Sequence, residues 1–168
     1  GDSAKTMAVS GLAVVGRDKF GVFPLKGKLL NTRDAGSAKI AANDEITAIK
    51  KIVGLETGKV YSDARELRYG SILVLADQDV DGFHIRGLLF NLFHSLWPSL
   101  FNTPGFLTSM LTPVVRVFGR AGAVRNFYNV PEFEKYMAGS PAHSRVKYYK
   151  GLGTSTSSDA KEYFRDMK

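Results

Sequence analysis

Three aspartates lie within five positions of this sequence, in the segment Asp77-Gln-Asp79-Val-Asp81-Gly82. Side chains two residues apart on an extended segment point to the same side, so the three carboxylates can converge on one point. Carboxylates that close together repel and raise one another's pKa values unless a cation lies among them. Because the donors are hard oxygens and the chain has no cysteine, the spacing predicts a site for Mg²⁺ or Mn²⁺, or for Ca²⁺.

The same letters also open an EF-hand calcium loop, which requires a glutamate at its twelfth position. Counted from Asp77, the twelfth residue is Leu88, and an apolar strand-like run precedes the segment where an EF-hand has a helix. We therefore reject an EF-hand. A structural alternative stays open, in which the aspartates only cap the helix that follows and hold a turn.

A glycine-rich segment, Lys147-Tyr-Tyr-Lys150-Gly-Leu-Gly153-Thr-Ser-Thr156, is the second candidate site. Small residues allow backbone N–H groups to approach a phosphate, and the hydroxyls and lysines add donors. The glycine spacing differs from that of a P-loop. The structural alternative is a strand-to-helix turn with Thr156 or Ser158 as the N-cap.

A third candidate is the basic segment Pro24-Leu-Lys26-Gly-Lys28-Leu-Leu-Asn31-Thr-Arg33. Its cations and amide can position a nucleic-acid backbone, although the same pattern is also typical of a solvated face. The formal net charge of +7 and the pI near 9.6 favour a polyanionic partner, with nucleic acid ahead of a membrane surface.

The elements that would position these residues follow from apolar periodicity. The run Ser71–Ala76 predicts a buried strand, and apolar residues at helical spacing from Ile85 to Leu100 predict a long helix after the acidic turn. This strand-to-helix unit is typical of an α/β sheet, whose ligands bind at the carboxyl edge of the strands. Further helices are expected at 2–11, 37–53, 131–137 and 157–168, and strands at 112–117, 127–130 and 145–149.

Length and composition exclude several classes of protein. A chain of 168 residues is one ordinary domain in length, and 44% hydrophobic residues argue against wholesale disorder. The absence of cysteine excludes disulfides, zinc ribbons and thiol chemistry. The longest apolar run, Ile72 to Ala76, is too short to cross a bilayer, and we expect no membrane partner and no secretory leader.

Taken together, these segments resemble the Toprim domain of the eukaryotic-type type IIA DNA topoisomerases. The resemblance spans nearly all of the chain, in the family's order. The segments that carry it are Gly1-Asp-Ser-Ala4, Ala8-Val-Ser-Gly11, Val15-Gly-Arg-Asp18, Pro24-Leu-Lys-Gly-Lys28, Leu67-Arg-Tyr-Gly70, Asp77-Gln-Asp-Val-Asp-Gly82 with His84-Ile85, and Lys147-Tyr-Tyr-Lys-Gly-Leu-Gly-Thr-Ser155.

This resemblance implies a Rossmann-like α/β Toprim fold with a mostly parallel central sheet flanked by helices. Residues 1–120 would form the Toprim core and residues 121–168 a β-rich C-terminal extension. The resemblance makes Asp77 catalytic and a metal ligand together with Asp79, with Asp81 assisting, and it makes Mg²⁺ the ion, for which Mn²⁺ or Ca²⁺ can substitute. It also implies that double-stranded DNA is contacted by two sets of residues: Lys26, Lys28 and Asn31 in the basic segment, and Lys150, Gly151, Gly153, Thr154 and Ser155 in the glycine-rich segment.

The implied activity is that of an ATP-dependent type II topoisomerase, an isomerase that passes one duplex through a transient double-strand break. The implied parent is a homodimer that uses ATP in another domain and works in the nucleus, with a mitochondrion or a viral replication site as alternatives. Two features of the family's pattern lie outside this sequence: a glutamate directly before Gly1, and a nucleophilic tyrosine in a winged-helix domain after Lys168. We therefore expect the isolated chain to be inactive. Phe83 also departs from the family, which usually has serine there.

Two other classes of function compete with this one. A non-catalytic DNA-binding or assembly module could keep the fold, but it would not need Asp77 and Asp79. A Toprim nuclease or primase would need neither the lysines of the basic segment nor the Gly-Leu-Gly-Thr sequence.

Overall fold

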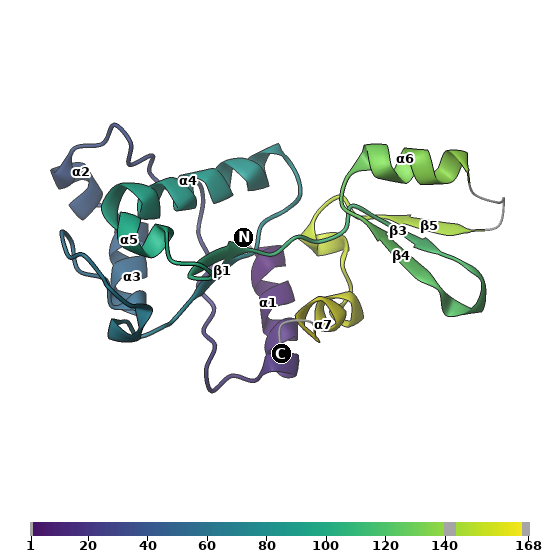
Figure 1. Cartoon of the computed structure of the whole chain (residues 1–168), viewed down its shortest axis with the longest axis horizontal. Helices are drawn as coiled ribbons and strands as arrows, with labels where there is room; N and C mark the ends of the chain where they lie inside the picture. The colour runs from purple at the N-terminus through teal and green to yellow at the C-terminus, as the bar shows by residue number, and fades with distance from the viewer. Residues whose placement is uncertain (1, 140–143, 166–168) are drawn as a thin grey trace. The chain divides into compact units, whose positions relative to one another are not determined.

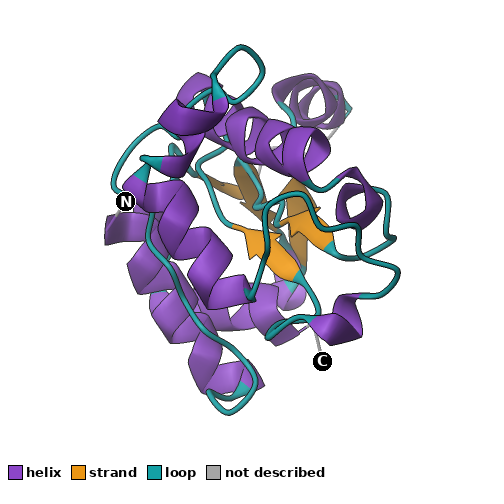
Figure 2. Cartoon of the chain, turned by 90° about the vertical axis from the view of Figure 1, so that its left-hand side faces the viewer, coloured by secondary structure: helices purple, strands orange, loops and turns teal. Residues whose placement is uncertain are grey.

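The computed structural model describes residues 2–139 and 144–165 as two compact units of mixed α/β structure (Figures 1 and 2). The first unit contains Pro24–Ala76 and Val80–Met110. The second contains Asp2–Phe23, Asp77–Asp79 and Leu111–Lys168. The chain therefore crosses from the first unit to the second between Ala76 and Asp77, and it returns to the first unit between Asp79 and Val80.

The first unit contains a small parallel sheet. Strand β1 (Ile72–Val74) pairs with β2 (Leu107–Ser109), and Ile72 lies opposite Leu107. Helices α4 (Val80–Leu96) and α5 (Pro98–Phe101) lie between these strands in the sequence, as a parallel pair requires a crossover connection. The expected order of strand, acidic turn and long helix is confirmed.

Two helices occupy the region where one was expected. Helix α2 (Ser37–Ala41) ends before Asn43, and α3 (Asp44–Val53) begins directly after it. The Asn43 side chain caps α3 by accepting a hydrogen bond from the Ile46 N–H at 3.0 Å, so the break is a helix start. Gly54 ends α3 in the left-handed conformation at φ 84°, as predicted. A short 3₁₀ turn, η1 (Ala64–Glu66), follows.

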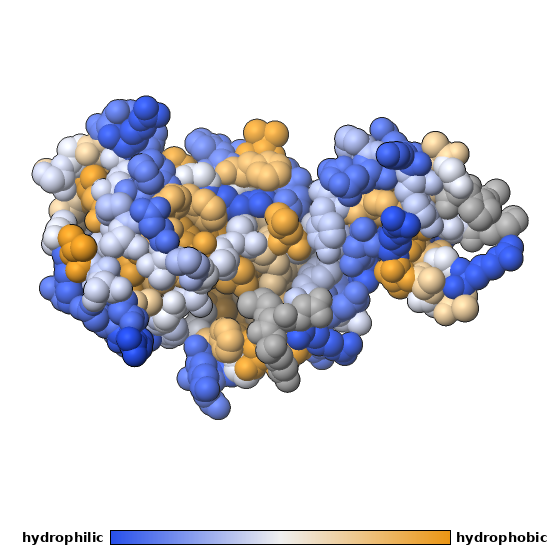
Figure 3. Space-filling model, in the orientation of Figure 1, coloured by the Kyte–Doolittle hydropathy of each residue, from blue (hydrophilic) through white to orange (hydrophobic). Residues whose placement is uncertain are grey.

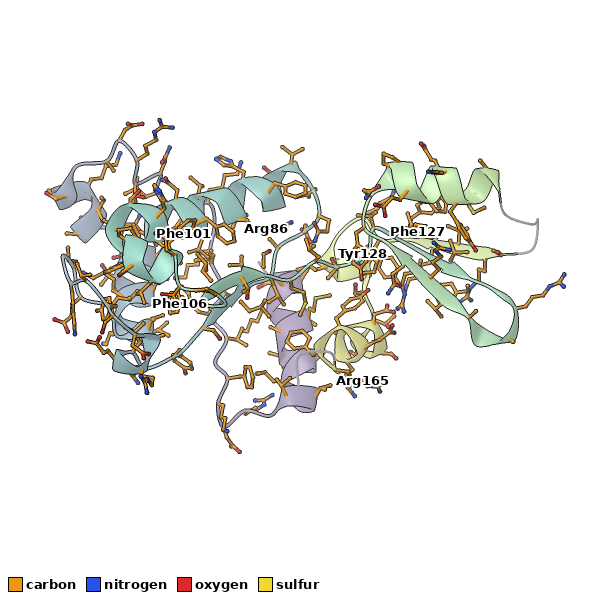
Figure 4. The ribbon with its side chains drawn as sticks, viewed as in Figure 1. Arg86, Phe101, Phe106, Phe127, Tyr128 and Arg165 are labelled. Atoms are coloured by element: carbon orange, nitrogen blue, oxygen red, sulfur yellow. The ribbon has the colours of Figure 1, made fainter. Side chains whose placement is uncertain are left out.

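Aromatic side chains dominate the core of the first unit. Phe93, Trp97, Leu100 and Phe106 are each at most 1% exposed. The Phe93 ring centroid lies 5.6 Å from that of Trp97 and 5.7 Å from that of Phe106, which Figure 4 labels. The Trp97 indole N–H donates to the Glu56 carbonyl at 2.8 Å, so its buried polar atom is satisfied.

The second unit contains a three-stranded antiparallel sheet. Strand β3 (Val115–Phe118) lies between β4 (Val124–Phe127) and β5 (Arg145–Tyr148), and a short turn, η2 (Arg120–Gly122), lies between β3 and β4 in the sequence. Helix α6 (Val130–Ala138) packs on the sheet through Phe133, whose ring centroid lies 5.7 Å from that of Phe127 (Figure 1). The strands predicted at 112–117 and 145–149 and the helix predicted at 131–137 are present, with their bounds shifted by up to three residues. The strand predicted at 127–130 shares only Phe127 with β4, and Val130 begins α6.

Two helices of the second unit lie side by side, α1 (Asp2–Val15) and α7 (Ser157–Arg165). The expectation that the first helix ends at Gly11 is wrong, because α1 continues to Val15 and is followed by Gly16 at φ 89°. Gly11 is instead a packing position. A Cβ there would lie 2.5 Å from ring carbons of Phe164 on α7. Helix α7 is confirmed to Arg165, and residues 166–168 lie outside the described residues.

We expect Gly11→Ala to destabilise the second unit by up to about 2 kcal/mol. The new methyl group overlaps the Phe164 ring and overpacks the α1–α7 contact, which costs about 1–3 kcal/mol, while the higher helix propensity of alanine returns about 1 kcal/mol. Urea unfolding followed by far-UV circular dichroism measures the loss, because the single tryptophan lies in the first unit.

Gly87→Ala is the matched control. Gly87 lies inside α4, and its added Cβ meets no atom within 4 Å. This substitution should raise stability by up to about 1 kcal/mol through helix propensity alone. If both variants shift stability in the same direction, the Phe164 contact does not explain the glycine at position 11.

The sheets differ from the mostly parallel central sheet that the resemblance implies. In the described residues the parallel pairing is limited to β1 and β2, and the other sheet is antiparallel. The mixed α/β class is confirmed, while the boundary at residue 120 stays a prediction.

No described helix has the length and apolar character needed to traverse a bilayer. Figure 3 shows hydrophilic residues over much of one face, with scattered apolar ones.

Candidate metal and nucleic-acid site

The acidic segment begins three residues after β1, and α4 starts within it. Asp77 is half-buried and Asp79 is exposed. Strand β1 ends at Val74, Gln78 and Asp79 lie in a bend, and α4 begins at Val80, so Asp81 lies in the first turn of the helix. The extended segment that was expected to align three carboxylates is therefore not present.

In the first unit, Asp81 forms an ion pair with Lys28. Lys28 Nζ lies 2.9 Å from Asp81 Oδ1, and both side chains are more than half exposed. The hydrogen bond from Lys28 lowers the pKa of Asp81 below its ordinary value. The structure thus brings together one predicted metal ligand and one predicted DNA contact.

No group of three or more histidine and carboxylate side chains that could hold a metal ion occurs in residues 2–139 and 144–165. The expected convergence of three carboxylates is thus absent from these residues. The oxygen donors of Asp77 and Asp79 still fit the chemistry of Mg²⁺, which proteins often bind through one or two carboxylates together with substrate phosphates. The assignment of metal ligands stays a prediction.

The glycine-rich loop, Lys150 to Ser155, contacts Asp77 within the second unit. It contains a 3₁₀ turn, η3 (Leu152–Thr154). The Leu152 backbone N–H donates to Asp77 Oδ1 at 2.6 Å, which is short, as expected for a charge-assisted hydrogen bond. Lys150, Gly153 and Thr154 are exposed, whereas Leu152 is buried. The predicted catalytic carboxylate and the predicted phosphate loop therefore form one arrangement.

A buried ionic network centred on Asp159 lies beside this loop. Asp159, in the first turn of α7, accepts hydrogen bonds from Arg116, Lys147, Tyr149 and Thr156. Burial alone would raise the pKa of Asp159, but the hydrogen bonds from Thr156 and Lys147 outweigh it and the pKa is lowered. Burial likewise opposes the charge on Arg116, but the hydrogen bond to Glu162 raises its pKa.

The other predicted DNA contacts belong to the first unit. The Lys26 side chain is exposed, and its backbone N–H donates to Glu45 Oε1 at 3.3 Å. Asn31 Oδ1 accepts from the Arg33 N–H at 3.1 Å and from Asn91 Nδ2 at 3.2 Å. These bonds fix the backbone of the basic segment and leave the Lys26 side chain at the surface.

A hollow lined by hydroxyl groups lies between α1 and the glycine-rich loop. Its volume is about 300 Å³. The hydroxyl residues that line it are Ser3, Thr6, Ser10, Ser155, Thr156 and Ser157. Hydroxyl groups are common donors to phosphate oxygens. The hollow is also lined by the Asp2 carboxylate and by apolar residues, among them Met7 and Leu152, so its lining is mixed.

Sequence reasoning missed Asp159 and Arg116. Thr156 caps α7, because the Asp159 N–H donates to Thr156 Oγ1 at 3.2 Å and the Thr156 N–H donates back to the carboxylate. An acid three residues after a capping threonine is a signature that would have revealed Asp159. Arg116 carries no such signal, because its partner is 43 residues away. The strand-to-helix turn with Thr156 as N-cap, which the sequence left open, is present.

Comparisons with known proteins support the resemblance. Residues 110–168 match the family described as the C-terminal associated domain of TOPRIM. The chain is 53% identical over 170 residues to "DNA topoisomerase 2" of Pisum sativum and 55% identical over 172 residues to "DNA topoisomerase 2" of Acanthamoeba polyphaga mimivirus. Each match covers 99% of this chain, which spans only 12% and 14% of those proteins.

A solved structure gives the same answer. The crystal structure of the Plasmodium falciparum topoisomerase II "DNA-binding, cleavage and re-ligation domain" matches with a TM-score of 0.92 and 47% sequence identity. The match covers 99% of this chain and 23% of that one. Sequence and fold therefore agree over nearly the whole chain, which is similar to one segment of the DNA topoisomerase 2 proteins and contains a match to the C-terminal associated domain of TOPRIM.

Proposed function

We propose that this chain is the Toprim part of the DNA cleavage and religation core of an ATP-dependent type II DNA topoisomerase, which passes one duplex through a transient double-strand break. The observation that carries the proposal is the 2.6 Å hydrogen bond from the Leu152 N–H to Asp77 Oδ1. It joins an acidic segment suited to Mg²⁺ and a loop suited to phosphates in one unit. A pure binding module has no need of that combination.

Each part of this arrangement has its own task. Asp77 and Asp79 would hold Mg²⁺, or Mn²⁺ or Ca²⁺ in its place, and Asp81 would assist only after its ion pair with Lys28 opens. The ion would stabilise negative charge that develops on the phosphate and on the leaving oxygen. Lys150, Thr154 and Ser155 would contact the DNA backbone together with Gly151 and Gly153, and Lys26, Lys28 and Asn31 would do so from the basic segment.

The remaining steps belong to a larger protein. The chain spans about an eighth of its curated relatives, so we assign ATP use, the homodimer and strand passage to the whole enzyme. A nuclear location, or a mitochondrial or viral replication site, is part of the same proposal. The relatives include a plant and a viral protein.

Lys150→Ala in the parent enzyme tests the loop. Because each lysine that neutralises a phosphate releases counterions, its loss should weaken DNA binding and reduce the slope of log K against log salt by about one. A fluorescence-anisotropy titration of a DNA duplex at several salt concentrations measures both.

Lys161→Ala is the matched control, since Lys161 is an exposed lysine on α7 of the same unit, outside the loop. It should leave the slope within experimental error. If the two variants change the slope equally, Lys150 contributes only general charge, and the proposed phosphate contact is wrong.

A further inference from the structure

Asp159 holds the residues on both sides of the glycine-rich loop. Before the loop, Lys147 Nζ lies 3.2 Å from Asp159 Oδ2, and the Tyr149 hydroxyl donates to Oδ1 at 3.3 Å. After it, the Thr156 N–H and hydroxyl donate to Oδ2 at 2.9 and 3.0 Å. The Asp159 side chain is only 11% exposed. One buried carboxylate therefore fixes where the loop leaves β5 and where it enters α7.

The middle of the loop, in turn, holds Asp77. The Leu152 N–H donates to Asp77 Oδ1, and a Cβ on Gly151 would lie 3.0 Å from the same oxygen. The φ of Gly151 is 176°, an extended value that any residue adopts, so its backbone does not require glycine. Close approach to the carboxylate is therefore the reason for a glycine at position 151.

We propose that Asp159 is a positioning residue for Asp77, which it orients through the loop from Lys150 to Ser155. Hydrogen bonds to a ligating carboxylate fix its orientation and tune its affinity for a metal ion. A loop held at both ends presents the Leu152 amide at a constant position, whereas a loop released at one end does not. The link to metal binding rests on the proposed function, but the link from Asp159 to the Leu152 amide does not.

Amide hydrogen exchange at Leu152, measured by NMR on the 168-residue chain, tests the first link. Asp159→Asn keeps the shape of the side chain and removes its charge, and it should speed exchange at Leu152 about tenfold relative to amides of β3. Asp159→Glu should restore most of the protection, because glutamate three residues after a capping threonine completes a capping box.

Glu162→Gln is the control for this measurement. Glu162 shares Arg116 with Asp159, but no described contact joins it to the loop. It should leave exchange at Leu152 unchanged. Equal exchange in the Asp159→Asn variant and the parent chain would overturn the proposal, as would an equal acceleration by Glu162→Gln.

The second link is tested in the parent enzyme with Gly151→Ala, which displaces Asp77 without touching Asp159. We expect Gly151→Ala and Asp159→Asn each to raise the Mg²⁺ concentration for half-maximal DNA cleavage several-fold. In Asp159→Asn, which changes no proposed DNA contact, DNA affinity at saturating Mg²⁺ should stay nearly unchanged. Gly119→Ala, whose added Cβ makes only ordinary contacts at 3.7 Å, should not change that concentration.

The exchange measurement and the Mg²⁺ titration test different parts of the argument, so a negative result in one is distinguishable from a negative result in the other. Faster exchange at Leu152 with an unchanged Mg²⁺ requirement would overturn the positioning role. Absence of Mg²⁺-dependent cleavage in the unmodified parent would instead remove the proposed function, and the exchange data would still decide whether Asp159 controls the loop.

Discussion

We expect Asp77→Ala, introduced into the full-length parent enzyme, to abolish Mg²⁺-supported DNA cleavage while DNA affinity stays within a few-fold. A bound divalent ion contributes several kcal/mol to the stabilisation of a phosphoryl-transfer transition state, so its loss should lower the rate by about a thousand-fold or more. Affinity depends mainly on cations that neutralise phosphates, and Asp77 is not one of them. Cleavage of supercoiled plasmid at increasing Mg²⁺ and binding of a labelled duplex measure the two quantities.

Glu134→Ala is a suitable control, because Glu134 is an exposed carboxylate on α6 of the same unit. It removes one negative charge and should leave cleavage and binding at parental levels. Asp77→Ala enzyme that cleaves DNA at the parental rate would refute the role assigned to this carboxylate. A large, equal loss of DNA affinity in that variant would point to a folding defect in the loop that Asp77 contacts.

The parts of the fold that follow local rules were predictable from the sequence. The apolar run before Asp77 predicted a strand, and β1 lies within it. The apolar periodicity after Asp81 predicted a long helix, which is α4. Gly54 ends α3 as a left-handed glycine should. In each case the signal lies within a few residues of the feature that it specifies, so no knowledge of distant neighbours was needed.

Gly11 and Asp81 show where local rules fail. Gly11 resembles a helix terminator, but its partner is Phe164, more than a hundred and fifty residues away in the sequence. Asp81 was assigned to an extended segment, but α4 begins one residue before it and Lys28 pairs with it. Both features depend on a neighbour that only the tertiary fold supplies. For the same reason the size of each sheet was not predictable.

The Asp159 network illustrates the same limit at the candidate site. The loop was identified from its glycines and lysines, which are consecutive in the sequence. The residues that hold it come from β3, β5 and α7. A site's chemistry is thus readable from a short segment, whereas the rigidity on which that chemistry depends is distributed over distant elements.

Arg116→Ala should therefore strongly destabilise the second unit. Arg116, with a side chain only 3% exposed, donates to Asp159 at 2.8 Å, Glu162 at 2.6 Å and Asn126 at 2.9 Å. Removing one partner of a buried ion pair costs about 3–5 kcal/mol, and we expect about 3 kcal/mol because Lys147 still neutralises Asp159. Urea unfolding followed by far-UV circular dichroism measures this loss, with the exposed Arg120→Ala as the control, expected within about 0.5 kcal/mol of the parent.

The dependence of this loss on pH provides a second test. The folded-state pKa of Asp159 is lowered, so its contribution to stability is fully present above the unfolded value of about 3.9 and disappears as pH falls through the lower folded value. Without Arg116 the folded pKa of Asp159 should rise, so the variant should lose stability at a higher pH during acidification. As pH falls below the unfolded value and then through the lower folded value, Asp159 becomes protonated, and the difference in unfolding free energy between parent and variant should shrink. A difference that stays constant from neutral pH to about pH 3 would show that the loss comes from packing of the arginine side chain rather than from its charge.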